Sequence, residues 1–223
     1  MIKLVAFFKR KEGISPEAFQ RHWRTAHAEL VVRQHGLQRY VQNHTLLSGY
    51  RRGEPDWDGV AEVWFDDTQA MRDLAPTPEY AAVRADEAHF IDAGSMGMVL
   101  TDEFVIVDGT APSGGVKWIG FLHKRSDVSV DSFREHWRER HGPIAARIPG
   151  IRRYVQCPAR TGIYEKGGTP DFDGVPISWF DDLDALRASG QSEAYEATRA
   201  DEAHFLAPGR IPFVVAAEHE IEL

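Results

Sequence analysis

The stretch FQRHWRTAH at residues 19–27 decides the fold, because the chain contains it twice. It returns as FREHWRERH at residues 133–141, with phenylalanine, tryptophan, arginine and two histidines in the same relative places. On an α-helix that turns by about 100° per residue, His22 and His27 flank the apolar stripe that holds Trp23, on opposite edges. A helix face that combines apolar side chains with histidines at its edges indicates that this helix covers a pocket.

The rest of the first half of the chain supplies the other elements of a small α+β unit. We expect strands at residues 2–8, 37–47, 59–65 and 98–107, one helix from Ser15-Pro16 to about Gly36, and a helical segment over 66–91 that is interrupted at Pro76 and Pro78. The order strand, helix, strand, strand, helix, strand is the ferredoxin-like signature.

The same order follows a second time. The heptapeptide RADEAHF of residues 84–90 recurs unchanged at 199–205. A repeat of this size is a whole fold unit and indicates tandem duplication. We therefore expect repeat 1 at residues 1–107, a linker of composition DGTAPSGG at 108–115, and repeat 2 at residues 116–223.

The first strand suggests how the two repeats are arranged. Residues 2–8 are apolar on both alternating faces, so the open face of each four-stranded sheet must be covered. Two such sheets packed face to face would cover one another. We predict an α+β fold of two tandem ferredoxin-like (βαββαβ) repeats packed sheet to sheet as an intramolecular pseudo-dimer. Two separate domains without contact are the alternative.

The composition limits the classes of partner that the protein could bind and the cellular compartment that we expect for it. The net charge of −8 argues against nucleic acid, whose recognition needs clustered positive charge. Cys157 is the only cysteine, so no intrachain disulfide can form. We see no apolar run of membrane-spanning length and no signal-peptide pattern. The sequence thus predicts a cytoplasmic protein that acts on a small molecule, binds neither nucleic acid nor membranes, and pairs internally; further pairing into a homodimer stays open.

The repeated motifs resemble the EthD family, within the dimeric α/β-barrel superfamily. The pattern F-x-x-H-W-x-x-x-H followed by G-(L/I)-x-R-Y-V-Q is carried by Phe19, His22, Trp23, His27, Gly36, Arg39, Tyr40, Val41 and Gln42, and again by Phe133, His136, Trp137, His141, Gly150, Arg153, Tyr154, Val155 and Gln156. The first repeat departs from the pattern at Ala28-Glu29, where the second has Gly142-Pro143. The resemblance covers the chain twice and implies an intramolecular dimeric α/β barrel with a pocket between each sheet and its helices.

The resemblance also implies a class of chemistry. Similar proteins include muconolactone-type isomerases and polyketide cyclases, dehydratases and decarboxylases, while more distant barrels are cofactor-independent monooxygenases or bind haem. In the methylisomerase branch a helix histidine and a strand tyrosine act on the substrate, which nominates His27 with Tyr40, and His141 with Tyr154, as catalytic pairs. The imidazole would take and return a proton, and the phenol would donate to a carbonyl or enolate oxygen. The alternative is a structural histidine and a tyrosine at the edge of the core.

Further residues near these pairs are candidates for substrate binding. They are His22, Trp23, His44 and Trp64 in repeat 1, and His136, Trp137 and Trp179 in repeat 2. For His22 and His136 a packing or capping role is the competing interpretation. His89 and His204 lie in the charged heptapeptide, which we expect to hold its helix to the sheet through ion pairs and hydrogen bonds. Cys157 is a weak candidate nucleophile.

The sequence predicts neither a metal site nor a cofactor. His22 and His27 are five residues apart, which on an α-helix separates their directions by about 140°. A glycine-rich phosphate loop after a strand is missing too, so nucleotide cofactors have no support.

We therefore predict a cofactor-independent lyase or isomerase (an isomerase, dehydratase, cyclase or decarboxylase) that acts on a carbonyl-bearing aromatic or lactone-like compound in a catabolic or biosynthetic pathway. The rival is a hydrophobic-ligand or haem-binding accessory protein of an oxygenase pathway. A third possibility keeps only the second pocket active, with the first repeat as its structural partner.

Overall fold

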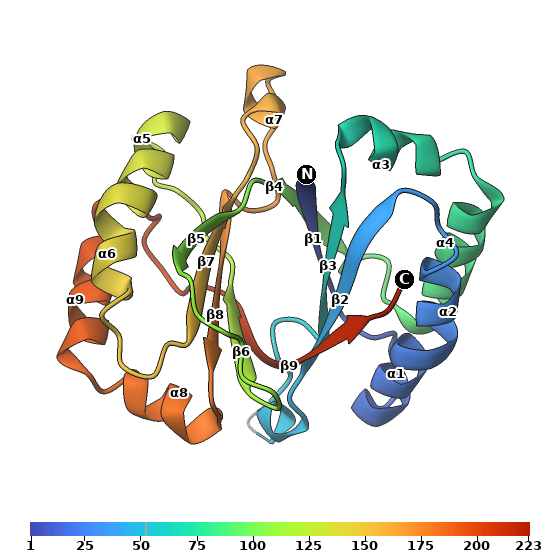
Figure 1. Ribbon diagram of the computed structural model, residues 1–223, viewed down its shortest axis with the longest axis horizontal. Helices are drawn as coiled ribbons and strands as arrows, with labels where there is room; N and C mark the ends of the chain where they lie inside the picture. Colours follow the sequence, from blue (N-terminus) through green and yellow to red (C-terminus); the bar gives the residue numbers. More distant parts are fainter. Residues whose placement is uncertain (52) are drawn as a thin grey trace. The chain divides into compact units, whose positions relative to one another are not determined.

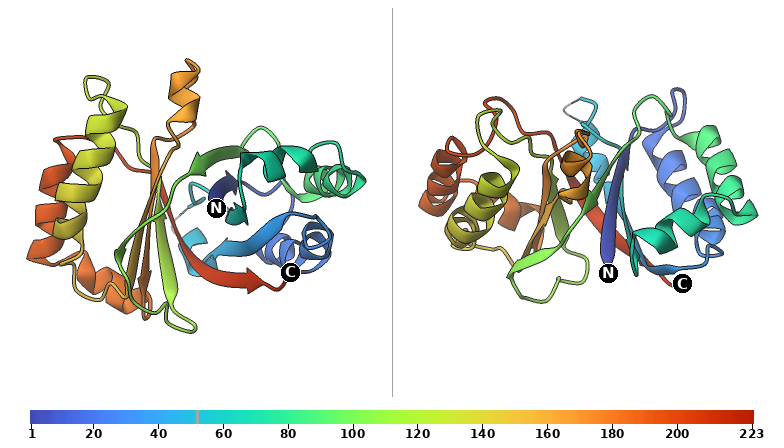
Figure 2. Two further views of the ribbon diagram at one scale, coloured as in Figure 1. Left: turned by 45° about the horizontal axis from the view of Figure 1, so that its top comes forward. Right: turned by 90° about the horizontal axis from the view of Figure 1, so that it is seen from above.

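The computed structural model describes residues 1–51 and 53–223 (Figure 1). They form two compact units: unit 1 comprises residues 1–100 and 218–223, and unit 2 comprises residues 101–217. In unit 2, helices α5, α6 and α9 lie on one face of the strands, and the views in Figures 1 and 2 both show this. Among the helices of the described residues, none is both long and apolar enough to span a bilayer.

Unit 1 contains the elements of the first repeat. They are β1 (Ile2–Phe8), α1 (Pro16–His22), the π-helix η1 (Trp23–His27), α2 (Ala28–Val31), β2 (Leu37–Thr45), the 3-10 helix η2 (Leu47–Tyr50), β3 (Gly59–Phe65), α3 (Thr68–Leu74), α4 (Pro78–Phe90) and β4 (Gly97–Thr101). The strand order is β4-β1-β3-β2, with β3 antiparallel to both of its neighbours. This is the predicted ferredoxin-like order.

Unit 2 repeats the pattern. Its elements are β5 (Phe104–Val107), β6 (Val116–Gly120), α5 (Val130–Glu135), the π-helix η3 (His136–His141), α6 (Gly142–Ala145), β7 (Arg153–Pro158), α7 (Gly162–Glu165), β8 (Gly174–Phe180), α8 (Leu183–Ser189), α9 (Glu193–Glu202) and β9 (Phe213–Ile221). The strand order here is β9-β6-β8-β7-β5, and the last residues of β9, from Glu218 onward, belong to unit 1 beside β2.

The single strand predicted at residues 98–107 is wrong, because the chain breaks it in two. β4 ends at Thr101, and β5 pairs with β7 of unit 2, with Phe104 opposite Gln156. Asp102 anchors the break: its N–H donates to the carbonyl of Pro158 at 3.1 Å, and its carboxylate accepts from Arg134 at 2.7 Å. The compact units therefore do not coincide with the sequence repeats.

The helix predicted from Ser15 to about Gly36 has a π-helical turn in its middle. Ser15 caps α1 as expected, since its Oγ accepts the N–H of Ala18 at 3.2 Å. The π turn holds an extra residue per turn, which brings side chains five positions apart onto the same face. The expectation that His22 and His27 splay by about 140° is wrong for this reason, and the same holds in η3 of unit 2.

Candidate active site

Asp201 of α9 holds both histidines of the π turn in repeat 2. Its Oδ2 accepts a hydrogen bond from Nδ1 of His141 at 2.9 Å, and Nε2 of His136 lies 3.1 Å from each carboxylate oxygen. An ionised carboxylate only accepts hydrogen bonds, so it fixes which ring nitrogen of each histidine carries the proton. The π turn is what makes this shared contact possible.

The bond to Asp201 gives His141 the arrangement of a general base. Burial lowers the pKa of the His141 imidazole, although the hydrogen bond to Asp201 opposes this. Burial also pushes up the pKa of Asp201, but hydrogen bonds from His141 and His136 outweigh it and hold that pKa below its usual value. His141 is therefore a neutral imidazole at neutral pH, with its proton on Nδ1 and a lone pair on Nε2.

A cavity of about 250 Å³ lies in unit 2, and His141 is part of its wall. Most of the wall is apolar. The sheet contributes Trp118, Tyr154 and Ser178, the helices contribute His141, Ser189 and Thr198, and Arg199 with Glu202 add charged groups. A small cavity with an apolar wall and a few convergent polar groups is the usual form of a ligand site.

Tyr154 brings a hydrogen-bond donor to this cavity, and Trp137 is a further part of its wall. The hydroxyl oxygen of Tyr154 accepts from the amide of Gln156 at 3.1 Å, and burial raises the Tyr154 pKa to about 12, so the phenol keeps its proton. The indole Nε1 of Trp137 is buried without a hydrogen-bond partner. Its ring packs directly on Gly174, where an added Cβ would lie 2.4 Å from the indole. Both side chains are thus held rigidly.

Glu202 is a second titratable group in the wall. Burial raises its pKa to about 7, although Arg199 opposes the shift through an ion pair with a 2.5 Å N–O distance. A carboxyl group with such a pKa is partly protonated at neutral pH and can give up a proton to a ligand.

Four positions explain why the cavity lies in repeat 2. Ala145, Ser178, Ser189 and Thr198 stand where repeat 1 has Val31, Val63, Leu74 and Val83. In repeat 1 these four aliphatic side chains belong to the buried core cluster or pack against it. At these four positions repeat 1 therefore has larger aliphatic side chains that pack into its core, where repeat 2 has smaller residues in the cavity wall.

The predicted pair His27 and Tyr40 lies in this core, with a corresponding histidine–aspartate contact and one further hydrogen bond to the tyrosine. Nδ1 of His27 lies 2.8 Å from Asp86, which also contacts His22 at 3.0 Å. The Tyr40 hydroxyl accepts from the indole of Trp23 at 2.9 Å, and burial raises its pKa. Tyr40 and Trp23 are members of the buried cluster, with 2% and 1% of their surface exposed.

His44 is part of the framework around Trp23. Its ring stacks on the indole, with centroids 4.6 Å apart and planes 8° apart, and meets His219 edge-on. The amide of Gln42 donates to Tyr40 and to the carbonyl of Trp23, so its Oε1 faces His44 and accepts from Nε2 at 2.9 Å. In repeat 2, Pro158 takes the place of His44, and Oε1 of Gln156 has no partner.

The buried position of His44 makes the stability of the fold depend on pH. Burial, with a smaller contribution from Arg24, lowers the pKa of His44 to about 3, below an ordinary value of 6.5. Stability is complete above pH 6.5 and declines as the pH falls toward 3, because only the unfolded chain binds the proton. We expect His44 to make the free energy of unfolding about 2 kcal/mol lower at pH 5 than at pH 7.

Urea unfolding of the wild type and His44→Gln at both pH values measures this contribution. Glutamine can still donate to Gln42, but it does not titrate. Between pH 7 and pH 5 the free energy of unfolding of His44→Gln should fall by about 2 kcal/mol less than that of the wild type. Equal pH dependence in the two proteins would contradict a neutral, buried His44.

The structure does not bring Trp64 and Trp179 to the cavity. Trp179 follows Ser178 on β8, and successive strand side chains point to opposite faces, so its ring faces away from the cavity. Each ring instead lies beside an ammonium group: Nζ of Lys117 is 4.6 Å from the Trp179 ring, and Nζ of Lys3 is 4.8 Å from the Trp64 ring. Such contacts are cation–π interactions.

Sequence reasoning missed the carboxylates. The charged heptapeptide is predicted to hold its helix to the sheet, whereas Asp86 and Asp201 bind the histidines of the first helical segment of their repeat. The unchanged recurrence of RADEAHF was the available signal. It did not reveal the partner, because the pairing depends on the π turn.

Comparison with solved structures identifies the fold. An anthrone oxidase-like protein is 11% identical, with 99% of this chain and 93% of that chain covered and a TM-score of 0.67. A candidate monooxygenase from Fusobacterium nucleatum is 11% identical, with 98% and 93% covered and a TM-score of 0.61. An EthD family protein from Bacillus halodurans is 24% identical over 47% of this chain and 99% of that chain, with a TM-score of 0.39.

At such identities the likeness shows the fold alone, and it confirms the predicted α+β class with ferredoxin-like repeats. The packing of the two sheets against one another stays a prediction. No protein of curated function matches the sequence. The sequence does match the EthD domain twice, at residues 11–94 and 125–209, which lie one in each predicted repeat. The chain therefore belongs to the EthD family, with two EthD domains in tandem.

Proposed function

We propose that unit 2 carries the active site of a cofactor-independent enzyme that moves protons on a small carbonyl compound. The observation that supports this most is His141, which lines the cavity and is hydrogen-bonded to Asp201 behind it. Nε2 of His141 takes a proton from an acidic C–H or phenolic O–H group of the substrate. Tyr154 donates a hydrogen bond to the oxygen on which negative charge develops.

The size of the cavity limits the substrate. An apolar cavity of about 150 Å³ accommodates benzene, so the roughly 250 Å³ found here suits a compound of one or two rings. The apolar wall favours an aromatic or lactone-like skeleton, and the convergent donors favour a carbonyl oxygen. Isomerisation, dehydration, cyclisation and decarboxylation of such compounds all pass through a species with charge on oxygen, so His141 and Tyr154 serve any of them.

Similar structures add support of a general kind. The names of two of them, an anthrone oxidase-like protein and a candidate monooxygenase, describe enzymes that act on small molecules. These names support the proposal that this chain acts on a small molecule.

Hydrogen–deuterium exchange tests the proposal without knowledge of the natural substrate. The bicyclic ketone 2-tetralone and the lactone 2-coumaranone carry acidic C–H groups next to a carbonyl and match the expected size. In D₂O the protein should accelerate loss of these proton signals in ¹H NMR spectra, by about 100-fold or more over buffer, which is the usual size of general-base catalysis.

Two results would contradict proton transfer. Saturable binding of both probes without any accelerated exchange would indicate a carrier of hydrophobic molecules. An absorption band near 400 nm on titration with haemin, with no exchange, would indicate a haem protein. An extract-wide search for the natural substrate is justified only after exchange is observed.

A further inference from the structure

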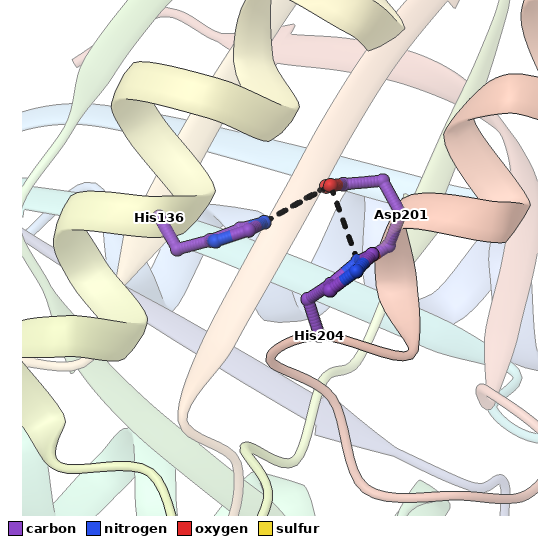
Figure 3. Close-up of side chains that lie close together, drawn as sticks. All are labelled: His136, Asp201 and His204. Atoms are coloured by element: carbon purple, nitrogen blue, oxygen red, sulfur yellow. Dashed lines mark hydrogen bonds and ion pairs between the residues drawn. The ribbon is translucent and has the colours of Figure 1, made fainter.

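Asp201 also lies beside two histidine side chains other than His141. Figure 3 shows His136 of η3, Asp201 of α9 and His204 of the turn after α9, with the two rings directed toward the carboxylate. Their donor atoms all lie within 4.8 Å of one another. Neither His136 nor His204 is among the residues that line the cavity. We propose that these three residues bind a divalent transition-metal ion.

The distances are close to those that coordination requires. Two ligands bound to zinc at about 2.0–2.1 Å in tetrahedral geometry are roughly 3.4 Å apart. Here Nε2 of His136 lies 3.1 Å from Oδ1 of Asp201, and Nδ1 of His204 lies 3.6 Å from the same oxygen. Metal binding would replace the hydrogen bond that Nδ1 of His204 donates to the main-chain carbonyl of Asp201 at 3.0 Å, and it would draw together the two ring nitrogens, which lie within 4.8 Å of one another.

The surroundings hold the ligands in place. His141 binds Oδ2 of Asp201, which fixes the carboxylate and leaves Oδ1 toward the other two rings. The His136 ring stacks on Phe205 at 4.9 Å. Arg125 donates to the carbonyl of Ala203 at 2.8 Å and so fixes the turn that presents His204. Outer hydrogen bonds of this kind orient metal ligands.

The chemistry of the donors selects the metal. Two imidazoles and one carboxylate, without thiolate, suit Zn²⁺, Co²⁺, Ni²⁺ or Cu²⁺ better than Mg²⁺ or Ca²⁺, which prefer oxygen ligands. The His204 side chain is 68% exposed, so one side of the site is open to solvent and to further water ligands.

Repeat 1 provides a natural comparison, because His22, Asp86 and His89 are the corresponding residues. Within residues 1–51 and 53–223, these three do not bring their donor atoms within the same 4.8 Å. The difference lies in the helix end: α4 continues to Phe90, past His89, whereas α9 ends at Glu202 and leaves His204 in a turn. The same residue types thus give a site in one repeat only.

Metal titration of the full chain, purified without a histidine tag and freed of metal by a chelator, tests the proposal. Isothermal titration with Zn²⁺ should give one saturable site per chain, and Co²⁺ should give a d–d absorption band that Zn²⁺ abolishes. His204→Ala should weaken Zn²⁺ binding by about 100-fold or more and remove the Co²⁺ band. His89→Ala, the matched change in repeat 1, should leave both signals unchanged.

The proposal is overturned if the wild type shows no saturable site, or if His204→Ala binds Zn²⁺ as the wild type does. Equal loss in His204→Ala and His89→Ala would also overturn it. Circular dichroism spectra confirm that both variants are folded, which exposed positions make straightforward. Because the readout is metal binding and not turnover, failure here leaves the exchange experiment unaffected.

Discussion

Filling the cavity with the side chains of repeat 1 should abolish ligand binding and catalysis while the fold is retained. The variant is Ser178→Val/Ser189→Leu/Thr198→Val, which copies the core residues at the corresponding positions of the first repeat. The added carbon atoms occupy the space now available to a ligand. We expect accelerated exchange of 2-tetralone to fall to the buffer rate, a loss of about 100-fold or more.

The same variant should also be more stable than the wild type. Burying additional aliphatic groups contributes about 0.8 kcal/mol per methylene. Of the three hydroxyls that are lost, those of Ser189 and Thr198 donate to helix carbonyls, of Leu186 and Ala194. We expect a gain of roughly 1–3 kcal/mol after the lost hydrogen bonds, worth about 1 kcal/mol each, are subtracted. Thermal unfolding measures this gain alongside the exchange rate.

The reverse change in repeat 1, Leu74→Ser, is the matched control. It removes a buried side chain from the core cluster and should lower stability by about 2–5 kcal/mol, as large-to-small core changes do, while exchange per folded molecule stays the same. If the filled variant keeps its activity, the cavity is not the site of reaction. If Leu74→Ser alone removes activity, the assignment to repeat 2 is wrong.

Replacing His141 by alanine should have the second large effect. The change removes Nε2, the proposed base, and we expect exchange to fall by about 10²–10⁴-fold. His27→Ala, the same change in repeat 1, removes the same hydrogen bond to an aspartate but leaves the cavity untouched. It should lower stability and leave the exchange rate of the folded protein within about twofold of the wild type.

Two observations keep this comparison decisive. Added imidazole should restore part of the exchange in His141→Ala, because the vacated space admits it, and should do nothing for the filled-cavity variant. Near-ultraviolet circular dichroism reports whether the tryptophans remain packed. Equal exchange in His141→Ala and the wild type, or equal losses in both alanine variants, would contradict a base that acts only in repeat 2.

Much of the architecture could be predicted from the sequence, because it is written in local patterns that occur twice. Ser15-Pro16 predicts a capped helix, and the interruption predicted at Pro76 and Pro78 is observed between α3 and α4. The repeated strand and helix patterns predict the order of the elements. The family resemblance names His141 and Tyr154, which both line the cavity.

Other features depend on contacts that no local pattern reveals. The π turn at residues 136–141 has ordinary helix-forming residues, so only its partner Asp201 distinguishes it from an α-helical turn. The break at Asp102 is set by Arg134 and Pro158, which are distant in sequence. These long-range pairings determine which side chains meet at the site.

The asymmetry between the repeats was visible in the sequence but could not be interpreted. Differences between corresponding positions, such as Val83 in repeat 1 and Thr198 in repeat 2, or Leu74 and Ser189, are ordinary on a helix face. They become informative only once the structure shows that the residues of repeat 2 line one cavity, whereas those of repeat 1 pack in a core cluster. The possibility that only the second repeat is active now has a physical basis.

The central claim is that a ligand in unit 2 contacts Nε2 of His141. Nitrogen-15 spectra of the histidine side chains, recorded while 2-tetralone is titrated into the labelled protein, test it most directly. The account predicts a saturable shift of the His141 Nε2 resonance and no change at His27. A shift at His27 instead, or saturated binding that leaves His141 unmoved, would contradict it.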